Sequence, residues 1–533
     1  MSVRDAIVIG AGHNGLVTAA YLSKAGRTVT VLERRERVGG ILDTVEIAPG
    51  VRAPGIVHTI GRLRRSVIDD LGLVQQGLVT IDPAVRVFAA QPDGPGLTIW
   101  ADAARTAAEL RERSPNDAEA YPAFDARVRA LASFLSYLHA ITPPDVKDPS
   151  IADALNGLKL GNAFRRLGAK AGREATRAMP MAIADYVAEA FETDAMRGAI
   201  ASRATMYTAM GPWSAGTTSV LLADSAGNDG GAAGQTVFAR GGPGALAVAL
   251  EAAGRAWGVE YRTGAEVATI ASHDGRATGV ALVGGEELTA RVVVAGIDPK
   301  RVLTRLVDPV AIGPTLLWRA GNIRTPGTVA KINLVLSGTP RFTAAGSDES
   351  LIHGRIVIAP GIDPLERAHD AAKYGQWSDP PVMEATIPSL VDPSLVDGAA
   401  DGTQVMSVIA QATPYALRDG TWDERRETFG DLVVSTLDAY APGLAAMVTA
   451  RQVLTPVDLE REYGLTGGHP MHGEHGLDQF FLWRPMLGQA RYRLALEGLY
   501  LAGAGSHPGG GVTGQNGQNA AREILSDWKK RRR

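Results

Sequence analysis

Three glycines near the start of the chain could hold a dinucleotide. Gly10, Gly12 and Gly15 form the pattern G-x-G-x-x-G directly after the apolar segment 5–9. In such a turn the first glycine permits a tight bend, the second lets the backbone approach a pyrophosphate, and the third lets helix and strand pack closely. Glu33 follows Gly15 by 18 residues, where a carboxylate can accept hydrogen bonds from ribose hydroxyls. The spacing therefore predicts a dinucleotide site.

The elements around these residues must present them at one edge of a sheet. Residues 5–9 predict a first strand, residues 16–25 a helix that ends at a glycine, and residues 28–33 a second strand. The N-terminus of that helix would direct free N–H groups and the positive end of its dipole at phosphates. We also assign His13, Asn14 and Arg34 to the cofactor site.

A second group of glycines lies near the other end of the chain. Residues 498–505 (GLYLAGAG) repeat the pattern of an apolar segment running into a glycine-rich turn, and residues 509–521 follow with further glycines. Gly39 and Gly40 would let the chain turn back beneath a cofactor. Segments about 490 residues apart that close one site predict a long cofactor, FAD, in place of a nicotinamide dinucleotide. The C-terminal residues assigned to it are Gly503, Gly505, Gly511, Val512 and Thr513.

These motifs together resemble those of a known protein family. Residues 10–16 (GAGHNGL), 32–35 (LERR) and 499–514 (LYLAGAGSHPGGGVTG) resemble the phytoene-desaturase-related branch of the flavoprotein group that includes amine oxidases. That branch contains carotenoid desaturases, carotene ketolases and pyridine nucleotide-disulphide oxidoreductase domain 2 proteins, and the similarity is greatest to the last. The resemblance implies an α/β chain with a Rossmann-like FAD-binding domain of the glutathione-reductase-2 or amine-oxidase type, an α+β substrate domain and a helical insertion. It also implies that the backbone of Val267 contacts the adenine side of FAD.

The same resemblance divides the chain into two discontinuous domains. Residues 1–75, 235–300 and 490–533 are expected to form the FAD-binding domain. Residues 76–234 and 301–489 are expected to form the substrate-binding domain, with a helical insertion at about 116–215. Apolar stretches separated by turns predict strands at 259–262, 265–270, 277–282, 287–295, 329–336 and 404–410.

Composition limits the class of protein. The 533 residues, 45% of them hydrophobic, suffice for two or three packed units. A net charge of −3 gives no sign of a nucleic-acid-binding surface. No run of about 18 apolar residues predicts a membrane span, and the first strand begins too early for a secretory signal, so we expect a cytoplasmic location. The absence of cysteine excludes a redox disulphide and a cysteinyl–flavin bond within this sequence.

Basic residues gather between positions 158 and 178. Six lysines and arginines interleave there with leucines and a phenylalanine, against the single acid Glu174. Two interpretations are open: an interfacial helix that collects a lipophilic substrate from a bilayer, or a solvated helix face in which glycines weaken the helix. The C-terminal residues 529–533 (KKRRR) either add attraction to anionic lipid or form a disordered tail.

Histidines are the candidate acid–base residues. His475 belongs to the histidine-rich segment 467–476, which we interpret as a loop lining the active site or as plain structure. We predict no metal site there, because the segment lacks cysteine and contains Pro470. His58 either approaches the isoalloxazine ring or packs, and His507 either fixes a turn or transfers protons. These three histidines are the catalytic candidates.

Hydride transfer to FAD is the chemistry that these expectations imply. We expect the protein to dehydrogenate or isomerise a lipophilic, isoprenoid or carotenoid-like substrate by hydride transfer to flavin N5, with oxygen or a quinone as electron acceptor. An FAD-dependent amine or alcohol oxidase that uses oxygen is the alternative, and a binding protein with a structural flavin is a third hypothesis. Arg62, Arg64 and Arg65 either hold an anionic group or lie at a solvated helix end.

Overall fold

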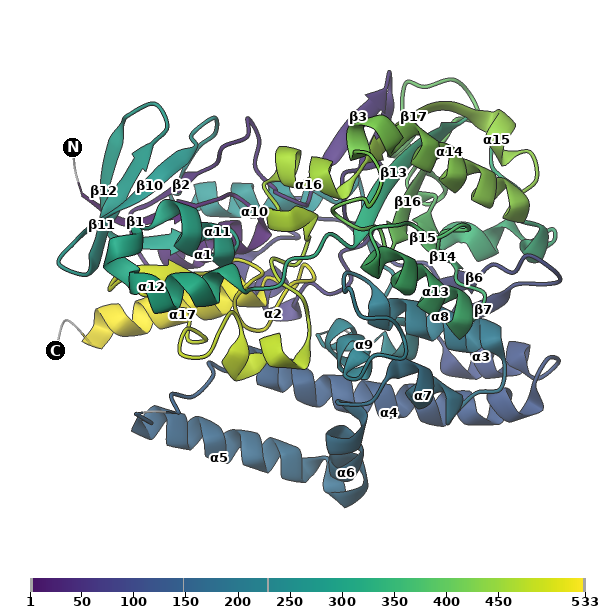
Figure 1. Ribbon diagram of the computed structural model, residues 1–533, viewed down its shortest axis with the longest axis horizontal. Helices are drawn as coiled ribbons and strands as arrows, with labels where there is room; N and C mark the ends of the chain where they lie inside the picture. The colour runs from purple at the N-terminus through teal and green to yellow at the C-terminus, as the bar shows by residue number, and fades with distance from the viewer. Residues whose placement is uncertain (1–2, 147, 228–229, 531–533) are drawn as a thin grey trace.

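The first sheet holds the parallel core that the sequence predicts. The computed structural model describes residues 3–146, 148–227 and 230–530. The strands of this sheet are β1 (Arg4–Ile9), β2 (Val29–Leu32), β9 (Glu260–Arg262), β10 (Val267–His273), β11 (Arg276–Leu282), β12 (Glu287–Ala295) and β18 (Leu499–Leu501). They run in the order β10-β11-β12-β1-β2-β9, with β18 paired to β12, and form the left part of the molecule in Figure 1. Parallel pairing places Ile9, Leu32, Ala295 and Leu501 at one edge, as in a Rossmann-like domain.

Three helices pack together on this sheet. α1 (His13–Lys24) contacts both α10 (Gly244–Ala256) and α17 (Gln515–Lys530). α1 begins three residues before the predicted start at 16, because the extended backbone of Gly12 serves as its N-cap. α17 approaches α1 so closely that a Cβ at Gly517 would lie 2.4 Å from the Asn14 carbonyl oxygen.

The second sheet lies to the right in Figure 1 and is built from the two insertions. Its strands are β6 (Val85–Ala89), β7 (Leu97–Trp100), β13 (Val329–Leu336), β14 (Arg355–Ile358), β15 (Met383–Thr386), β16 (Gln404–Gln411) and β17 (Val448–Leu454). They run in the order β17-β13-β16-β15-β14-β6-β7, and the strands predicted at 329–336 and 404–410 are confirmed as β13 and β16. The hairpin of β3 (Thr44–Ala48) and β4 (Val51–Pro54) packs on this sheet, where Asn333 Nδ2 donates to the Pro54 carbonyl at 3.1 Å.

A group of helices lies in the lower part of Figure 1, with α5 and α6 below α4. It contains α3 (Ala103–Leu110), α4 (Pro115–Ala140), α5 (Ile151–Arg166), α6 (Gly168–Ala178), α7 (Ile183–Ala188), α8 (Asp194–Thr205) and α9 (Thr217–Ser225). α5 starts at a capping box made by Ser150 and Asp153 and continues through Gly157 and Gly161, so both glycines lie inside the helix. The break comes at Gly168, whose φ is +80°.

Further elements connect these parts. They are α2 (Arg65–Leu71), β5 (Thr80–Ile81), β8 (Phe238–Ala239), α11 (Pro299–Arg301), α12 (Pro309–Gly321), α13 (Ile362–Lys373), α14 (Trp422–Tyr440), α15 (Leu444–Met447) and α16 (Pro456–Tyr463). Within the described part of the chain, no helix combines the length and the apolar character that crossing a bilayer requires.

Candidate functional site

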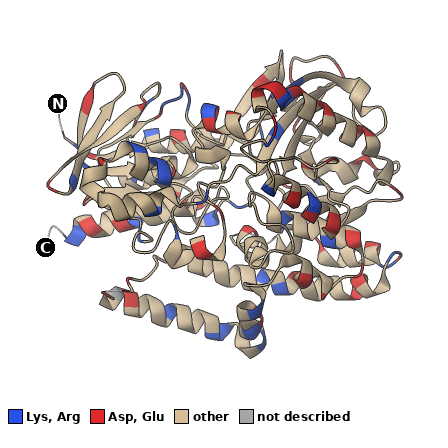
Figure 2. Cartoon of the chain, viewed as in Figure 1, with Lys and Arg blue, Asp and Glu red and all other residues tan. Residues whose placement is uncertain are grey.

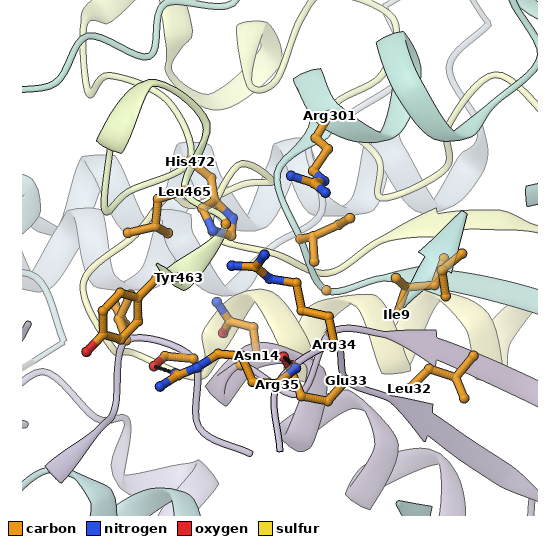
Figure 3. A pocket seen from close by; sticks show the side chains of 18 of the residues that line it. Ile9, Asn14, Leu32, Glu33, Arg34, Arg35, Arg301, Tyr463, Leu465 and His472 are labelled. Atoms are coloured by element: carbon orange, nitrogen blue, oxygen red, sulfur yellow. Dashed lines mark hydrogen bonds between the residues drawn. The ribbon is translucent and has the colours of Figure 1, made fainter. Parts of the chain in front are cut away.

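A cavity opens where the parallel strands of the first sheet end (Figure 3). This cofactor cavity holds about 950 Å³ of empty space, part of it continuous with solvent. Ligands of open α/β sheets bind outside the carboxyl ends of the strands, which is where it lies. The predicted residues that line it are Gly10, Gly12, His13, Asn14, Glu33, Arg34, Gly40 and Val267.

The three glycines after β1 have different structural roles. Gly10 has a φ of +90°, and a Cβ there would lie 2.7 Å from Ile297 Cγ2. A Cβ at Gly15 would lie 2.2 Å from the Gly10 carbonyl oxygen, so only glycine allows α1 to start this close to β1. Gly12 has no atom within 4 Å of the position of a Cβ. Its backbone therefore faces free space that a pyrophosphate can enter.

The first turn of α1 offers unused polar groups to this cavity. No side chain caps the helix at Gly12, which leaves main-chain N–H groups for a bound anion. The buried Asn14 Oδ1 has no hydrogen-bond partner among the described residues, and the hydroxyls of FAD are donors that would satisfy it. Burial lowers the pKa of His13 to about 4, so its imidazole is uncharged at neutral pH.

Glu33 is held in position by the backbone. Its Oε2 accepts a hydrogen bond from the Ala11 N–H at 2.8 Å, and its Oε1 accepts one from the Arg35 N–H at 3.0 Å. A carboxylate has about four acceptor positions, so capacity remains for two ribose hydroxyls. The side chain faces the cofactor cavity in Figure 3.

Arginines surround the same cavity. Arg34 Nη2 donates to two backbone carbonyls of α16, at 3.0 and 2.7 Å. Sequence reasoning missed Arg35, which stacks over the Tyr463 ring at 4.6 Å, and Arg301, whose Nη2 lies 3.4 Å from Glu266 Oε1. Guanidinium groups match the geometry of phosphate oxygens. Together with the glycines and Glu33, they fit the adenosine diphosphate half of FAD.

Three further glycines of the predicted cofactor site pack next to the residues that line the cavity. Gly39 has a φ of +120°. A Cβ at Gly503 would lie 2.5 Å from the Ile297 carbonyl oxygen, and a Cβ at Gly505 would lie 2.3 Å from Pro299 Cδ. These positions therefore need glycine for close packing, while their neighbours Gly40 and Ala504 line the cavity.

The turn before α17 meets a second, inner cavity. Gly511 has a φ of +119°, Val512 has a φ of +57°, and the Thr513 carbonyl accepts a hydrogen bond from the Arg64 N–H at 3.0 Å. A Cβ at Gly511 would lie 1.8 Å from Arg62 Nη1. The inner cavity contains about 310 Å³ of empty space, part of it open to solvent. It is lined by Arg62, Arg203, Met206, Tyr207, Val220, Asp224, Met471 and His475.

The interpretation of Arg62 as part of a solvated helix end is wrong. The C-terminal turn and α9 cover its side chain, which is 12% exposed and donates from Nη2 to the Ala223 carbonyl at 2.6 Å. Arg64 is also partly buried and donates from Nη2 to the Ser136 carbonyl at 3.1 Å. Arg65 alone is solvated, in an exposed pair with Asp69.

The three catalytic candidates are uncharged at neutral pH. His58 Nδ1 lies 3.7 Å from Glu384 Oε1, and burial lowers the His58 pKa to about 4. His475 Nε2 accepts a hydrogen bond at 3.1 Å from a main-chain N–H of the C-terminal turn, and burial holds the His475 pKa well below its usual range. His507 Nε2 lies 3.1 Å from the Leu138 carbonyl oxygen, and burial lowers the His507 pKa to about 3.

The histidines of segment 467–476 point in different directions. His469 Nδ1 accepts a hydrogen bond from the Met471 N–H at 3.2 Å, His472 lines the cofactor cavity, and His475 lines the inner cavity. Across the described ranges, no group of three or more His, Cys, Asp or Glu side chains is placed to hold a metal ion. The segment 467–476 therefore contributes side chains to both cavities.

A buried cluster of charges adjoins the inner cavity. Glu384 Oε2 lies 3.0 Å from Arg355 Nη1 and 3.3 Å from Arg203 Nη1. Arg203 also pairs with Asp224, whose Oδ1 lies 3.4 Å from Arg62 Nη1. Burial alone would raise the pKa of Glu384, but the neighbouring guanidinium groups hold that pKa below its usual range. Three guanidinium groups thus share two carboxylates.

Lys331 is the functional candidate that sequence reasoning missed. It lies on β13, is 1% exposed, and its Nζ has no hydrogen-bond partner among the described residues. Burial lowers the Lys331 pKa well below 10.5 even though Glu384 is near, and its charge would also act on His58. A lysine inside the apolar strand VAKINLVL is the signal that could have identified it.

Comparisons with known proteins agree with this geometry. The model of the NAD(P)-binding Rossmann-like domain matches residues 8–67, and that of the flavin containing amine oxidoreductase family matches residues 105–375. Pyridine nucleotide-disulfide oxidoreductase domain-containing protein 2 of Rattus norvegicus is 34% identical, over 98% of this chain and 94% of the relative. Two further relatives are a limonene dehydrogenase polypeptide of Castellaniella defragrans (27% identical, 98% and 94% covered) and phytoene desaturase (neurosporene-forming) of Rhodobacter capsulatus (26%, 95% and 91%).

Solved structures extend the comparison to the fold. Putrescine oxidase bound to putrescine superposes with a TM-score of 0.62 at 15% identity, covering 98% of this chain and 99% of that one. The predicted resemblance to phytoene-desaturase-related flavoproteins is confirmed, and so is FAD as the cofactor. The chain belongs to the family of flavin-containing amine oxidoreductases and is an FAD-dependent oxidoreductase.

Proposed function

We propose that this oxidoreductase dehydrogenates or isomerises a lipophilic molecule, isoprenoid or carotenoid-like, by hydride transfer to flavin N5. The observation that carries the proposal is the inner cavity. Met206, Val220 and Met471 form the apolar part of its lining, opposite polar and charged side chains, and both carboxylates of the charge cluster are already engaged by guanidinium groups. A hydrocarbon needs no charged partner in such a cavity. The relatives named for limonene and phytoene, both hydrocarbons, support the same substrate class.

The charges near the inner cavity argue against an amine substrate. Among the described residues of the cluster, three guanidinium groups face two carboxylates. A protonated amine about 4 Å from an uncompensated guanidinium would be repelled by about 4 kcal/mol at an effective dielectric constant near 20. The likeness to putrescine oxidase concerns the fold and carries no substrate with it.

Some of the residues described above would hold FAD, and others would accept a proton from the substrate. The glycine turn after β1, the N-terminus of α1 and Glu33 would hold the adenosine diphosphate half of FAD, and the turn before α17 its flavin half. Bound FAD supplies the hydride acceptor. Lys331 Nζ and His58 Nε2 are buried and unpaired among the described residues, and burial lowers the pKa of both side chains, that of His58 to about 4. Both atoms lie near Glu384 of the charge cluster, and we propose that Lys331 takes up the proton that a substrate loses. We propose oxygen or a quinone as the final electron acceptor.

Anaerobic titration of the flavin absorbance tests the proposal. Limonene or a linear polyene is expected to bleach the flavin, whereas amines and alcohols of similar size leave it unchanged. Bleaching by amines or alcohols alone would refute the lipophilic substrate. Flavin that dithionite reduces but no organic donor reduces would indicate a structural cofactor.

A matched pair of variants tests the proton-handling role. Lys331→Met is expected to slow bleaching by the best donor about 100-fold, the effect of removing a general base. Ile332→Met, on the same buried strand, is the control and should leave the rate unchanged. Equal rates in the two variants would remove Lys331 from the mechanism.

A further inference from the structure

The outer face of α5 exposes large apolar side chains. Ile151, Leu155 and Leu158 are 82%, 52% and 72% exposed. Their spacing of four and three residues places them on one side of the helix. On the opposite side Phe164 packs against Phe134 of α4, with ring centroids 5.5 Å apart. The helix is therefore anchored to the protein by one side and presents an apolar stripe to its surroundings with the other.

Unpaired cations accompany this stripe. The exposed basic residues of α5 and α6 are Lys159, Arg165, Arg166, Lys170 and Arg173. Their side chains form no ion pair or hydrogen bond with another residue in the described part of the chain. Glu174, the acid among them, is 16% exposed and pairs with Arg127 and Arg177. Figure 2 shows blue segments along the ribbon of α5 and α6.

A groove runs between α4 and α5. Phe134, Tyr137 and Leu167 give it apolar walls, and Lys159 and Arg166 stand at it as cations. It contains about 880 Å³ of empty space, part of it open to solvent. The groove therefore adds apolar surface and two cations to the exposed side of this helix pair.

We propose that the outer face of α5, together with the cations of α6, docks onto a membrane that contains anionic lipid. An amphipathic helix lying in the interface buries its apolar stripe among the acyl chains and keeps its cations at the headgroups. The charge favours this occupant over a second copy of the chain, because two such faces would oppose five unpaired cations to five others. The inference goes beyond the proposed substrate class and does not depend on it.

Cosedimentation of the purified flavoprotein with vesicles tests the docking surface. We expect binding to vesicles of phosphatidylcholine and phosphatidylglycerol, weak binding to phosphatidylcholine alone, and release at high ionic strength. Arg165→Gln with Arg166→Gln should weaken binding about 30-fold. Leu155→Asn with Leu158→Asn should weaken it about 100-fold. Because these side chains are exposed, the FAD content and circular dichroism of the variants should match those of the wild type.

Matched variants on other faces are the controls. Val248→Asn with Val283→Asn removes two equally exposed apolar side chains, and Arg111→Gln with Arg240→Gln removes two exposed cations. Neither pair should alter binding. The proposal is overturned if vesicles do not bind the protein, if binding ignores the anionic lipid, or if the controls weaken it as much as the α5 variants. It is also overturned if sedimentation without lipid shows a dimer that Leu155→Asn with Leu158→Asn dissociates.

Discussion

Replacing Lys331 by methionine should stabilise the protein. The Lys331 Nζ is buried without a hydrogen-bond partner among the described residues, and an unpaired polar group of this kind costs about 1–3 kcal/mol. Methionine has a similar length and no polar group to desolvate. We therefore expect Lys331→Met to raise the free energy of unfolding by about 1–3 kcal/mol from the unpaired group alone, with a further contribution below pH 10.5 from the proton that the unfolded lysine binds; urea denaturation of the holoprotein measures the sum.

The pH dependence gives the sharper measurement. Burial lowers the Lys331 pKa in the folded state well below 10.5, so the unfolded chain binds one more proton than the folded chain between the lowered pKa and 10.5. Wild-type stability then rises with pH in this window, by about 1.4 kcal/mol per pH unit from this group. The advantage of Lys331→Met should therefore shrink as the pH rises from 7.5 to 9.5. Ile332→Met should show no such slope relative to wild type.

One result would refute this reasoning. If wild type and Lys331→Met keep a constant difference in the free energy of unfolding from pH 7.5 to 9.5, then Lys331 holds the same number of protons in both states. The lysine would then be charged in the folded protein. It could no longer be counted as a proton acceptor.

Three further predictions concern the cofactor cavity and the charge cluster. Gly15→Ala should lose bound FAD, because its Cβ would meet a main-chain carbonyl oxygen 2.2 Å away; the ratio of flavin to protein absorbance measures this, and Gly284→Ala, which has open space, should retain FAD. Glu33→Ala should weaken FAD binding about 10–100-fold by fluorescence titration, since a charged hydrogen-bond acceptor is lost; unchanged affinity would exclude its contact with the cofactor. Arg355→Met breaks a buried pair with Glu384 and should lower the free energy of unfolding by about 3–5 kcal/mol in urea; a loss below about 1 kcal/mol would contradict the pairing.

Local patterns predicted the elements that depend on near neighbours in the sequence. The glycine turn after β1 and the alternation in 329–336 each lie within a few residues, and the structure places a turn and a strand there. The same reasoning misjudged Arg62, because the segments that bury it come from α9 and from the C-terminal turn. The residues next to Arg62 in the sequence give no indication that α9 and the C-terminal turn cover its side chain.

The charge cluster could not be predicted for a related reason. Lys331 and Glu384 lie in separate parts of the chain and meet because β13 and β15 flank β16, where both residues pair with Ile409. His58 reaches Glu384 from the segment after β4. Periodicity identifies a strand but does not give its neighbours. The sequence shows a lysine within an apolar strand. Only the structure shows that its Nζ has no hydrogen-bond partner among the described residues.

The late position of β18 and α17 has a consequence for biosynthesis. β18 completes the first sheet beside β12, and α17 covers α1, yet these elements follow β1 by about 490 residues. A ribosome adds about 5–20 residues per second, so β1 and α1 wait roughly half a minute or longer for their partners. The cofactor cavity, to which Ala504 contributes, therefore becomes complete only when almost the whole chain has been synthesised.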